Sequence, residues 1–318
     1  MGSKYYLGVD GGQSSTTALI GDDRGLVLGI GRGGPSNHVG AAEGRAKFVN
    51  AIEGSLAAAW QHAGLDSSTP RFASAVLGFS GGPADKQAIL KEILKSERTL
   101  VTHDALIALS GAVAGEAGLI TIAGTGSIAF GRDASGETAR AGGWGFIFGD
   151  EGGGFYIARQ ALRAALRFEE GWGPPTSLRP VLLDATGARN ANELLHRFYT
   201  PEFPRPRIAG FAKLVDQAAE SGDVTAAEIL NDAAQQLATL AGAVCDQLFG
   251  EDERVRVAHV GGVFRSRTVR EKFRTLVEMT PGSQVIAPIY GPAAGALLEA
   301  YRTAGIKCTL SNVPEEKA

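Results

Sequence analysis

Val9-Asp10-Gly11-Gly12-Gln13-Ser14 decides the fold, because a matching stretch, Ile122-Ala123-Gly124-Thr125-Gly126-Ser127, follows in the second half of the chain. Each stretch ends an apolar run, and each is followed by two further apolar runs with turn residues between them. This pattern predicts a three-stranded antiparallel meander at the start of each half. The expected strands are 5–9, 16–20 and 26–30 in the first half and 119–122, 127–131 and 138–141 in the second.

Helical periodicity alternates with short apolar runs after each meander. The expected helices are 40–63, 84–94, 105–114, 153–168, 191–198, 208–221, 224–249 and one that ends at 303, and the remaining strands are 73–79, 99–102, 255–260 and 284–289. A duplicated unit of this order predicts an α/β fold with two similar domains around a central cleft. Ligands in such folds collect at the carboxyl ends of the strands.

The expected domain limits are 1–115 and 116–305, and the second domain contains a helical insert. The last helix of the second domain is also able to pack back on the first. Residues 306–318 are expected to form a poorly ordered polar tail.

Composition excludes several classes of protein. The chain has 318 residues, 44% hydrophobic and 20% charged, with a net charge of −3, so neither a disordered chain nor a nucleic-acid or anionic-membrane partner is expected. Cys245 and Cys308 lack the spacing of a zinc site or a disulfide framework. The N-terminus is too short and polar for a signal peptide, and glycines break the apolar stretch 105–131. We therefore expect a cytoplasmic protein without a membrane span.

The two glycine turns are candidate phosphate sites. Their backbone N–H groups and hydroxyls can hold phosphate oxygens, and a carboxylate beside phosphate needs a bridging Mg²⁺. One such turn alone is equally well explained as an ordinary hairpin, but two at equivalent places favour ATP binding. The candidate residues are Asp10 for the metal, Gly11, Gly12, Gln13, Ser14 and Ser15 in the first turn, and Gly124, Thr125 and Gly126 in the second.

Other polar residues follow strand ends in the same way. Asp104 lies between an expected strand and helix, where it can serve both as a helix N-cap and as a general base, and His103 is better explained by capping or packing. The loop 142–154 is very rich in glycine, and Asp150 within it can accept hydrogen bonds from hydroxyls while Trp144 offers an apolar wall. Asn37 can both donate and accept hydrogen bonds. The chain has 44 glycines, about twice the ordinary share, and the excess is interpreted as backbone that approaches ligands at strand ends, as at Gly33 and Gly126.

Six motifs in this order resemble the N-acetylglucosamine kinases over about residues 5–300. They are DGGQSST (10–16), GGPSN (33–37), THDA (102–105), AGTGS (123–127), GGWGFIFGDEGGG (142–154) and VGGVFRS (260–266). These kinases are similar to the activator ATPases of acyl-CoA dehydratases and reductases. Both belong to the BadF/BadG/BcrA/BcrD-type ATPase family of the sugar kinase/Hsp70/actin superfamily.

The resemblance implies two duplicated ribonuclease-H-like domains, ATP and Mg²⁺ as cofactors, an amino sugar as substrate and a homodimer. It implies transfer of the γ-phosphoryl group to the 6-hydroxyl, with Asp104 as general base and Asp10 near Mg²⁺. The first turn with Ser14 would meet the β- and γ-phosphates, Thr125 and Gly126 would form a second clamp, and residues 208–212 would lie near the base. Gly261 and Gly262 would border the adenosine, and the implied sugar contacts are Asn37, Ser127, Gly143, Trp144, Gly145 and Asp150.

Three departures from the family pattern leave alternatives open. Gln13 replaces a glycine, Ile128 stands where animal enzymes have a sugar-contacting Asn, and Gly153 replaces the usual Ser. Glucosamine and N-acetylmuramate therefore remain alternative substrates, and the lactyl carboxylate of N-acetylmuramate would need a cation such as Arg32 or Arg140. An activator ATPase is disfavoured because its iron–sulfur cluster needs suitably placed cysteines. A sugar-sensing regulator is disfavoured because no DNA-binding segment precedes Asp10.

Overall fold

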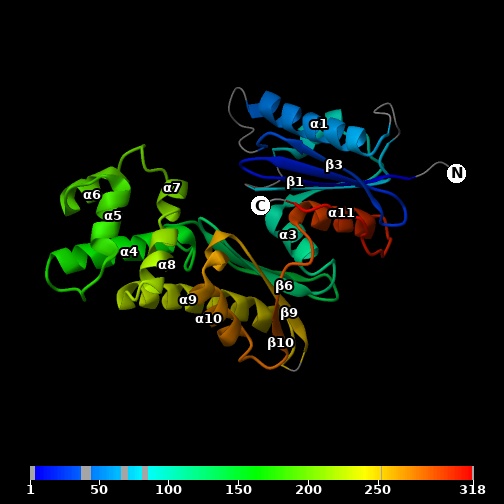
Figure 1. The fold of residues 1–318 in the computed structure, drawn as a ribbon. Helices are drawn as coiled ribbons and strands as arrows, with labels where there is room; N and C mark the ends of the chain where they lie inside the picture. Colours follow the sequence, from blue (N-terminus) through cyan, green and yellow to red (C-terminus); the bar gives the residue numbers. More distant parts are fainter. Residues whose placement is uncertain (1–3, 37–43, 66–70, 81–84, 252, 317–318) are drawn as a thin grey trace. The chain divides into compact units, whose positions relative to one another are not determined.

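The structure, a computed structural model, describes residues 4–36, 44–65, 71–80, 85–251 and 253–316 (Figure 1). The chain divides into two compact units. Unit 1 consists of Met1–Glu116 and Ala287–Ala318, and unit 2 consists of Ala117–Ile286. Within the described parts of the chain, no helix is both long and apolar enough to cross a membrane.

Unit 1 is built on a five-stranded sheet with the order β3-β2-β1-β4-β5. The central strand β1 is antiparallel to β2 and parallel to β4, so the carboxyl ends of β1, β4 and β5 meet at one sheet edge. The strands are β1 (Tyr6–Gly11), β2 (Thr16–Gly21), β3 (Val27–Gly33), β4 (Ser74–Phe79) and β5 (Thr99–His103).

Helices cover both faces of this sheet, because its strands are apolar on both sides. Leu7 and Val9 pack under α1 (Gly44–His62) and α2 (Gln87–Ile93), whereas Tyr6 packs with α3 (Asp104–Ala112) and α11 (Pro292–Thr303). Figure 1 shows α1 on one side of the sheet and α3 with α11 on the other.

Glycines let these helices lie directly on the strands. A Cβ atom at Gly31 would overlap the backbone of α1 at Ser55, and one at Gly8 would overlap the backbone of α11 at Leu297. Gly33 faces α1 in the same way, at Ala51. Part of the glycine excess therefore serves helix packing, which corrects its interpretation as ligand-facing backbone alone.

Unit 2 repeats the arrangement, with the sheet order β10-β9-β6-β7-β8. The strands are β6 (Gly118–Ala123), β7 (Ser127–Arg132), β8 (Thr138–Gly142), β9 (Val255–Val260) and β10 (Ser283–Ile286). Strand β6 corresponds to β1, because each is antiparallel to the next strand and parallel to a later one. The predicted duplication and both predicted meanders are confirmed.

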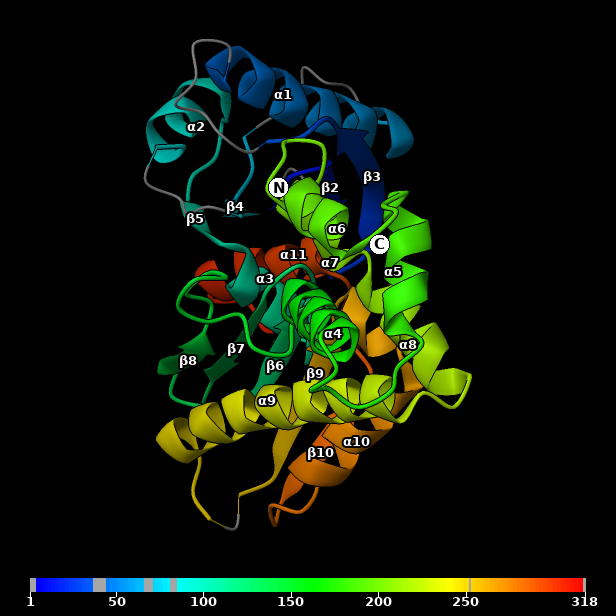
Figure 2. The ribbon, with the colours of Figure 1, turned by 90° about the vertical axis from the view of Figure 1, so that its left-hand side faces the viewer.

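An insert of helices lies between β8 and β9 (Figure 2). The long helix α9 packs across β6, β7 and β8, and the hydrophobic core of unit 2 gathers around it. The helices of unit 2 are α4 (Gly154–Glu169), α5 (Leu178–Thr186), α6 (Ala191–Phe198), α7 (Arg205–Ala209), α8 (Ala212–Glu220), α9 (Val224–Leu248) and α10 (Arg267–Val277), with a 3₁₀ turn η1 (Gly262–Arg265).

The structure departs from the sequence expectations in several elements. The single helix expected at 208–221 is two helices, α7 and α8, that meet at Gly210 and Phe211. The sequence pattern gives no residue range for helices α5 and α10, which the structure contains. Strand β10 ends at Ile286, because Pro288 in the expected strand 284–289 cannot donate a backbone hydrogen bond to a neighbouring strand. The last helix, α11, packs in unit 1 against α3 and β1.

The expected disorder after Gly305 is wrong as far as Glu316. Leu310 is buried, Ser311 forms an isolated bridge with Leu26, and Asn312 Nδ2 donates to the Val27 carbonyl at 3.0 Å. The segment ends with Glu316, whose carboxylate accepts from the backbone N–H groups of α11. Its polar sequence reflects contacts with backbone groups rather than loose chain.

Candidate active site

The first glycine turn joins β1 to β2 in unit 1. Gly12 N donates to Ser15 O at 2.9 Å, which closes the turn, and Ser36 N donates to Gly12 O at 3.2 Å. Gln13, Ser14 and Ser15 at the tip are exposed. Their backbone and hydroxyl groups are therefore accessible to a ligand, as the phosphate hypothesis requires.

Strand register brings Asp104 to the same sheet edge as this turn. Gly11 is in register with Phe79 of β4, and Phe79 is in register with His103 of β5. Asp104 follows as the first residue of α3, and His103 is the N-cap, with its Nδ1 accepting from Leu106 N at 3.3 Å. The capping role thus belongs to His103, and the expected N-cap role of Asp104 is corrected.

Burial governs the electrostatics of this edge. It raises the pKa of Asp10 to about 7, with smaller contributions from the negative charges of Glu316 and Asp104. Burial also raises the pKa of Asp104, although a backbone hydrogen bond from Ala105 and the nearby His103 act in the opposite direction. Both carboxyls would gain from a neighbouring cation or an added proton.

Glu316 closes the same region through α11. Its carboxylate accepts from Ala293 N and Ala294 N, both at 2.9 Å, at the positive end of the helix. Gly291 makes room for it, because a Cβ there would overlap the Glu316 carboxylate. Sequence reasoning missed this residue because only the path of the chain back to α11 gives it a partner.

The second glycine turn, in unit 2, is tied to the start of α4. Gly124 N donates to Gly126 O at 2.9 Å, and Gly154 N donates to Gly124 O at 2.8 Å. A Cβ at Gly153 would lie 2.7 Å from the backbone carbon of Gly126, so the turn and helix meet too closely for a side chain. This contact explains why glycine at 153 suits this chain.

A pocket of about 640 Å³ opens beside this turn in unit 2. It brings Gly124 and Thr125 together with Gly262 and with the α7–α8 junction at Ala209 and Gly210. The predicted phosphate turn, adenosine border and base-side segment therefore share one pocket. The polar side chains that line it and that sequence reasoning missed are Lys213, Asp216, Gln217, Glu220, Arg265 and Ser266.

Two of the nucleotide residues predicted in unit 2 lie outside the lining of this pocket. Gly261, with φ of 113°, lies against Ala123, where a Cβ would overlap the Ala123 carbonyl. Gly126 faces the carboxylate of Asp150 instead. Both glycines therefore allow close packing around the second glycine turn, and neither lines the pocket.

The glycine-rich loop holds Asp150 in an unusual position. Asp150 has φ of 64°, a left-handed conformation that a non-glycine residue adopts only at a cost, and its side chain is buried. It accepts from Ser127 N at 3.2 Å and pairs with Arg205 of α7. The predicted sugar contacts Ser127 and Asp150 are thus brought together.

Three further predicted sugar contacts lie on the same loop. Gly143 and Gly145 both have positive φ, and Trp144 is 63% exposed with the Arg140 guanidinium 4.4 Å from its ring centre. Ile128, which replaces the family Asn, packs against the backbone of Gly143. Asn37 lies outside the described residues, so its role stays a prediction.

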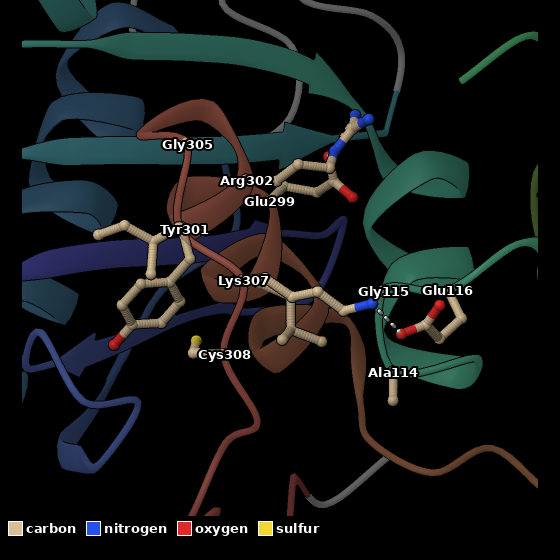
Figure 3. A pocket seen from close by; sticks show the side chains of 11 residues that line it. Ala114, Gly115, Glu116, Glu299, Tyr301, Arg302, Gly305, Lys307 and Cys308 are labelled. Carbon is tan, nitrogen blue, oxygen red and sulfur yellow. Dashed lines mark hydrogen bonds and ion pairs between the residues drawn. The ribbon is translucent and has the colours of Figure 1, made fainter. Parts of the chain in front are cut away.

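A second pocket, of about 330 Å³, lies in unit 1 (Figure 3). It is formed by the end of α3, the carboxyl-terminal half of α11 and the segment that follows α11. Its buried Glu299 is already paired with Arg302 at 2.7 Å and accepts from Ser110. The Asp10 edge lies near the opposite end of α11, so this pocket is separate from the candidate site.

We expect a methyl group at Gly126 to disturb both the second glycine turn and the position of Asp150. The Cβ of Gly126→Ala would lie 2.5 Å from the Asp150 carboxyl carbon, so overpacking should cost about 1–3 kcal/mol of unfolding free energy. Chemical denaturation measures this loss. The matched control is Gly242→Ala in α9, where a Cβ meets no atom within 4 Å and stability should be unchanged or higher. Equal stability of the two variants would contradict the geometry.

Comparisons with known proteins identify the family. The chain matches the BadF/BadG/BcrA/BcrD ATPase family over residues 7–300. It belongs to this family. Membership in this ATPase family implies that the protein uses ATP.

Similar proteins cover nearly the whole chain. An N-acetylmuramic acid/N-acetylglucosamine kinase from Clostridium acetobutylicum is 30% identical over 305 residues, which are 93% of this chain and 97% of the relative. An N-acetyl-D-glucosamine kinase from Dictyostelium discoideum is 28% identical over 323 residues, or 95% and 99% of the two chains.

A solved structure from Chromobacterium violaceum, provisionally assigned as an N-acetylglucosamine kinase, superposes with a TM-score of 0.73. It is 28% identical and covers 93% of this chain and 98% of its own. The equivalent sheets of units 1 and 2 and this match confirm the predicted α/β fold of two duplicated ribonuclease-H-like domains, as in actin-like ATPases.

Proposed function

We propose that the protein is a cytoplasmic kinase that transfers the γ-phosphoryl group of ATP to the 6-hydroxyl of N-acetylglucosamine, with Mg²⁺ as cofactor. The observation that carries this proposal is the similarity to two kinases whose names include N-acetylglucosamine, each aligned over more than nine-tenths of this chain. The two glycine turns and the pocket beside the second turn support it chemically. A homodimer remains part of the proposal.

The unit 2 pocket is the proposed nucleotide site. Its volume, about 640 Å³, suits a ligand of nucleotide size. Backbone N–H groups around Gly124 and Thr125 would hold phosphate oxygens, and the α7–α8 junction with Gly262 would enclose the adenosine. Lys213 and Arg265 are exposed on its lining and add positive charge for an anionic ligand.

Asp10 is the proposed contact for Mg²⁺, an ion that proteins usually bind through one or two carboxylates together with substrate phosphates. Its carboxyl is desolvated, and the nearby acidic residues Glu316 and Asp104 raise its pKa further, so a divalent cation would relieve the repulsion. Among the described residues, no group of three or more His, Cys, Asp or Glu side chains could hold a metal ion. Bound Mg²⁺ would neutralise charge on the transferring phosphoryl group.

Asp104 is the proposed general base for the sugar hydroxyl. The 6-oxygen forms a bond to the γ-phosphorus as the bond to the β–γ bridging oxygen breaks, and the hydroxyl proton passes to the Asp104 carboxylate. ADP leaves with the bridging oxygen. The raised pKa of Asp104 makes its carboxylate a stronger base than an exposed aspartate, which suits late proton transfer. Ser127 and Asp150 would orient the sugar.

An activator ATPase is not favoured by the number and placement of the cysteines. An iron–sulfur cluster needs several cysteine ligands, whereas this chain has one cysteine in unit 1, Cys308, and one in unit 2, Cys245. Cys245 also contacts Ser283 at 3.9 Å within unit 2. N-acetylmuramate, in contrast, is a second substrate that a specific groove supports, as argued below.

A coupled assay of ADP release across several sugars tests the proposal. We expect turnover of N-acetylglucosamine with a kcat/KM at least tenfold above that of glucose and N-acetylmannosamine. The same assay without sugar should show only slow ATP hydrolysis, because phosphoryl transfer needs a positioned acceptor. ATP hydrolysis that is the same with and without every sugar would contradict a sugar kinase.

A further inference from the structure

An apolar groove of about 700 Å³ lies beside the glycine-rich loop in unit 2. Helices α4, α6 and α7 form its walls, and these helices lie near one another in Figure 2. Three aromatic side chains from the loop and two of these helices make up much of the lining. We call this the arginine groove, defined by Phe146, Phe155, Phe198, Arg159, Arg163 and Arg205.

The charge of the arginine groove has one sign. Arg159, Arg163 and Arg205 all line it, and no acidic side chain lies among its described lining residues. Arg159 and Arg163 are exposed and one turn apart on α4. An apolar groove edged only by cations is complementary to a ligand that carries an apolar part and an acidic group.

Arg205 connects the groove to the proposed sugar site. Its guanidinium lies 5.1 Å from the ring centre of Phe146 and 5.8 Å from that of Phe155, so both rings contribute cation–π contacts. One nitrogen, Nη2, pairs with the Asp150 carboxylate. The groove and the sugar contact at Asp150 are therefore joined through a single side chain.

The same guanidinium has an unused donor. Arg205 Nε is buried, and it has no hydrogen-bond partner among the described residues. A buried donor without an acceptor costs about 1–3 kcal/mol, so this position favours a ligand that supplies an acceptor. A guanidinium has five N–H donors, which allows it to hold Asp150 and a second carboxylate together.

We propose that the arginine groove receives an acidic substituent of the amino sugar, with Arg205 donating to its carboxylate. The substrate class is then N-acetylated amino sugars with a carboxylate-bearing ether, and N-acetylmuramic acid, which carries a lactyl ether, is the probe. This inference rests on the proposed kinase function. In this proposal Arg205, which pairs with Asp150, binds the lactyl carboxylate, whereas the sequence suggested Arg32 or Arg140 for that role.

Steady-state kinetics of Arg205 variants test the assignment. For Arg205→Gln, the ratio of kcat/KM for N-acetylmuramate to that for N-acetylglucosamine should fall by about 10–100-fold, because a charge-assisted pair is lost. Arg205→Lys keeps the charge without the planar fork and should give an intermediate ratio. The matched control is Arg167→Gln, on the same helix α4 but stacked on Trp172 outside the groove, which should leave the ratio unchanged.

A second variant is needed because Arg205→Gln could also displace Asp150 and so lower the activity on N-acetylglucosamine as well as on N-acetylmuramate. Arg159 lies over the Tyr156 ring and Arg163 donates to Gln160, so replacing both arginines by Gln should lower the ratio by about 3–10-fold through N-acetylmuramate alone. An unchanged ratio in both sets of variants would overturn the inference. Wild-type protein that phosphorylates N-acetylglucosamine but not N-acetylmuramate would overturn it too, with the kinase proposal intact. Turnover of neither sugar would refute the kinase proposal itself.

Discussion

Asp104→Asn should lower kcat for N-acetylglucosamine by about 10²–10⁴-fold, the range expected when a general base is removed. The substitution keeps the shape of the side chain at the first position of α3, and His103 still caps the helix. KM for ATP should change by less than about threefold, because the proposed nucleotide pocket belongs to unit 2. Steady-state kinetics with both substrates varied measure the two effects separately.

The folded state should tolerate this change well. Burial raises the pKa of Asp104, so the ionised carboxylate is unfavourable in the folded protein and a neutral amide should not reduce stability at neutral pH. Asp23→Asn, at an exposed position in the same unit, is the matched control and should retain full activity. A kcat for Asp104→Asn within threefold of wild type would remove Asp104 as the base.

Asp10→Asn should have two opposite effects, a large loss of activity and a gain of stability above neutral pH. Loss of the proposed Mg²⁺ contact should lower kcat/KM by at least about 10²-fold, since charge neutralisation dominates phosphoryl transfer. Stability without nucleotide or metal should rise by about 2–4 kcal/mol at pH 8, because the pKa of Asp10 is raised to about 7 in the folded protein.

The sign of this pH dependence follows from the direction of the shift. A raised pKa in the folded state means that the contribution of Asp10 to stability is complete below its unfolded pKa of about 4. That contribution is lost as the pH rises through about 7. Wild-type protein without ligands should therefore lose stability between about pH 4 and pH 7, and Asp10→Asn should lose much less.

Thermal unfolding across this pH range measures the effect. Glu316→Gln provides a second check, since it removes a charge that raises the pKa of Asp10 and keeps one of the two oxygens that accept from Ala293 N and Ala294 N. The pH range over which Glu316→Gln loses stability should lie lower than that of wild type. Identical pH profiles for wild type and Asp10→Asn would show that Asp10 is not desolvated in this way.

Local pattern was enough to predict the strands and both glycine turns. The turn residues around Gly11 and Gly124 stand next to apolar runs, and pairing of β1 with β2 and of β6 with β7 needs only these neighbours. The place of Asp104 was also predictable, because parallel strands bring their carboxyl ends to one edge.

Residues that act through distant contacts were not predictable. Arg205 is 55 residues from Asp150 in sequence, and only the folding of α7 against the glycine-rich loop brings them together. The break between α7 and α8 at Gly210 interrupts a helical period that the apolar spacing alone continues. Gly33 and Gly126 are both predicted from sequence to approach a ligand, yet Gly33 faces α1 and Gly126 faces Asp150.

Analysis of the reaction product tests the proposed phosphoryl transfer most directly. Purified protein is incubated with ATP, Mg²⁺ and N-acetylglucosamine, and the products are followed by ³¹P nuclear magnetic resonance. We predict one new sugar phosphate signal, coupled to the protons on carbon 6, that grows in equal amount with ADP and is lost with Asp104→Asn. Inorganic phosphate as the sole product beside ADP, or a phosphate on another sugar carbon, would contradict transfer to the 6-hydroxyl.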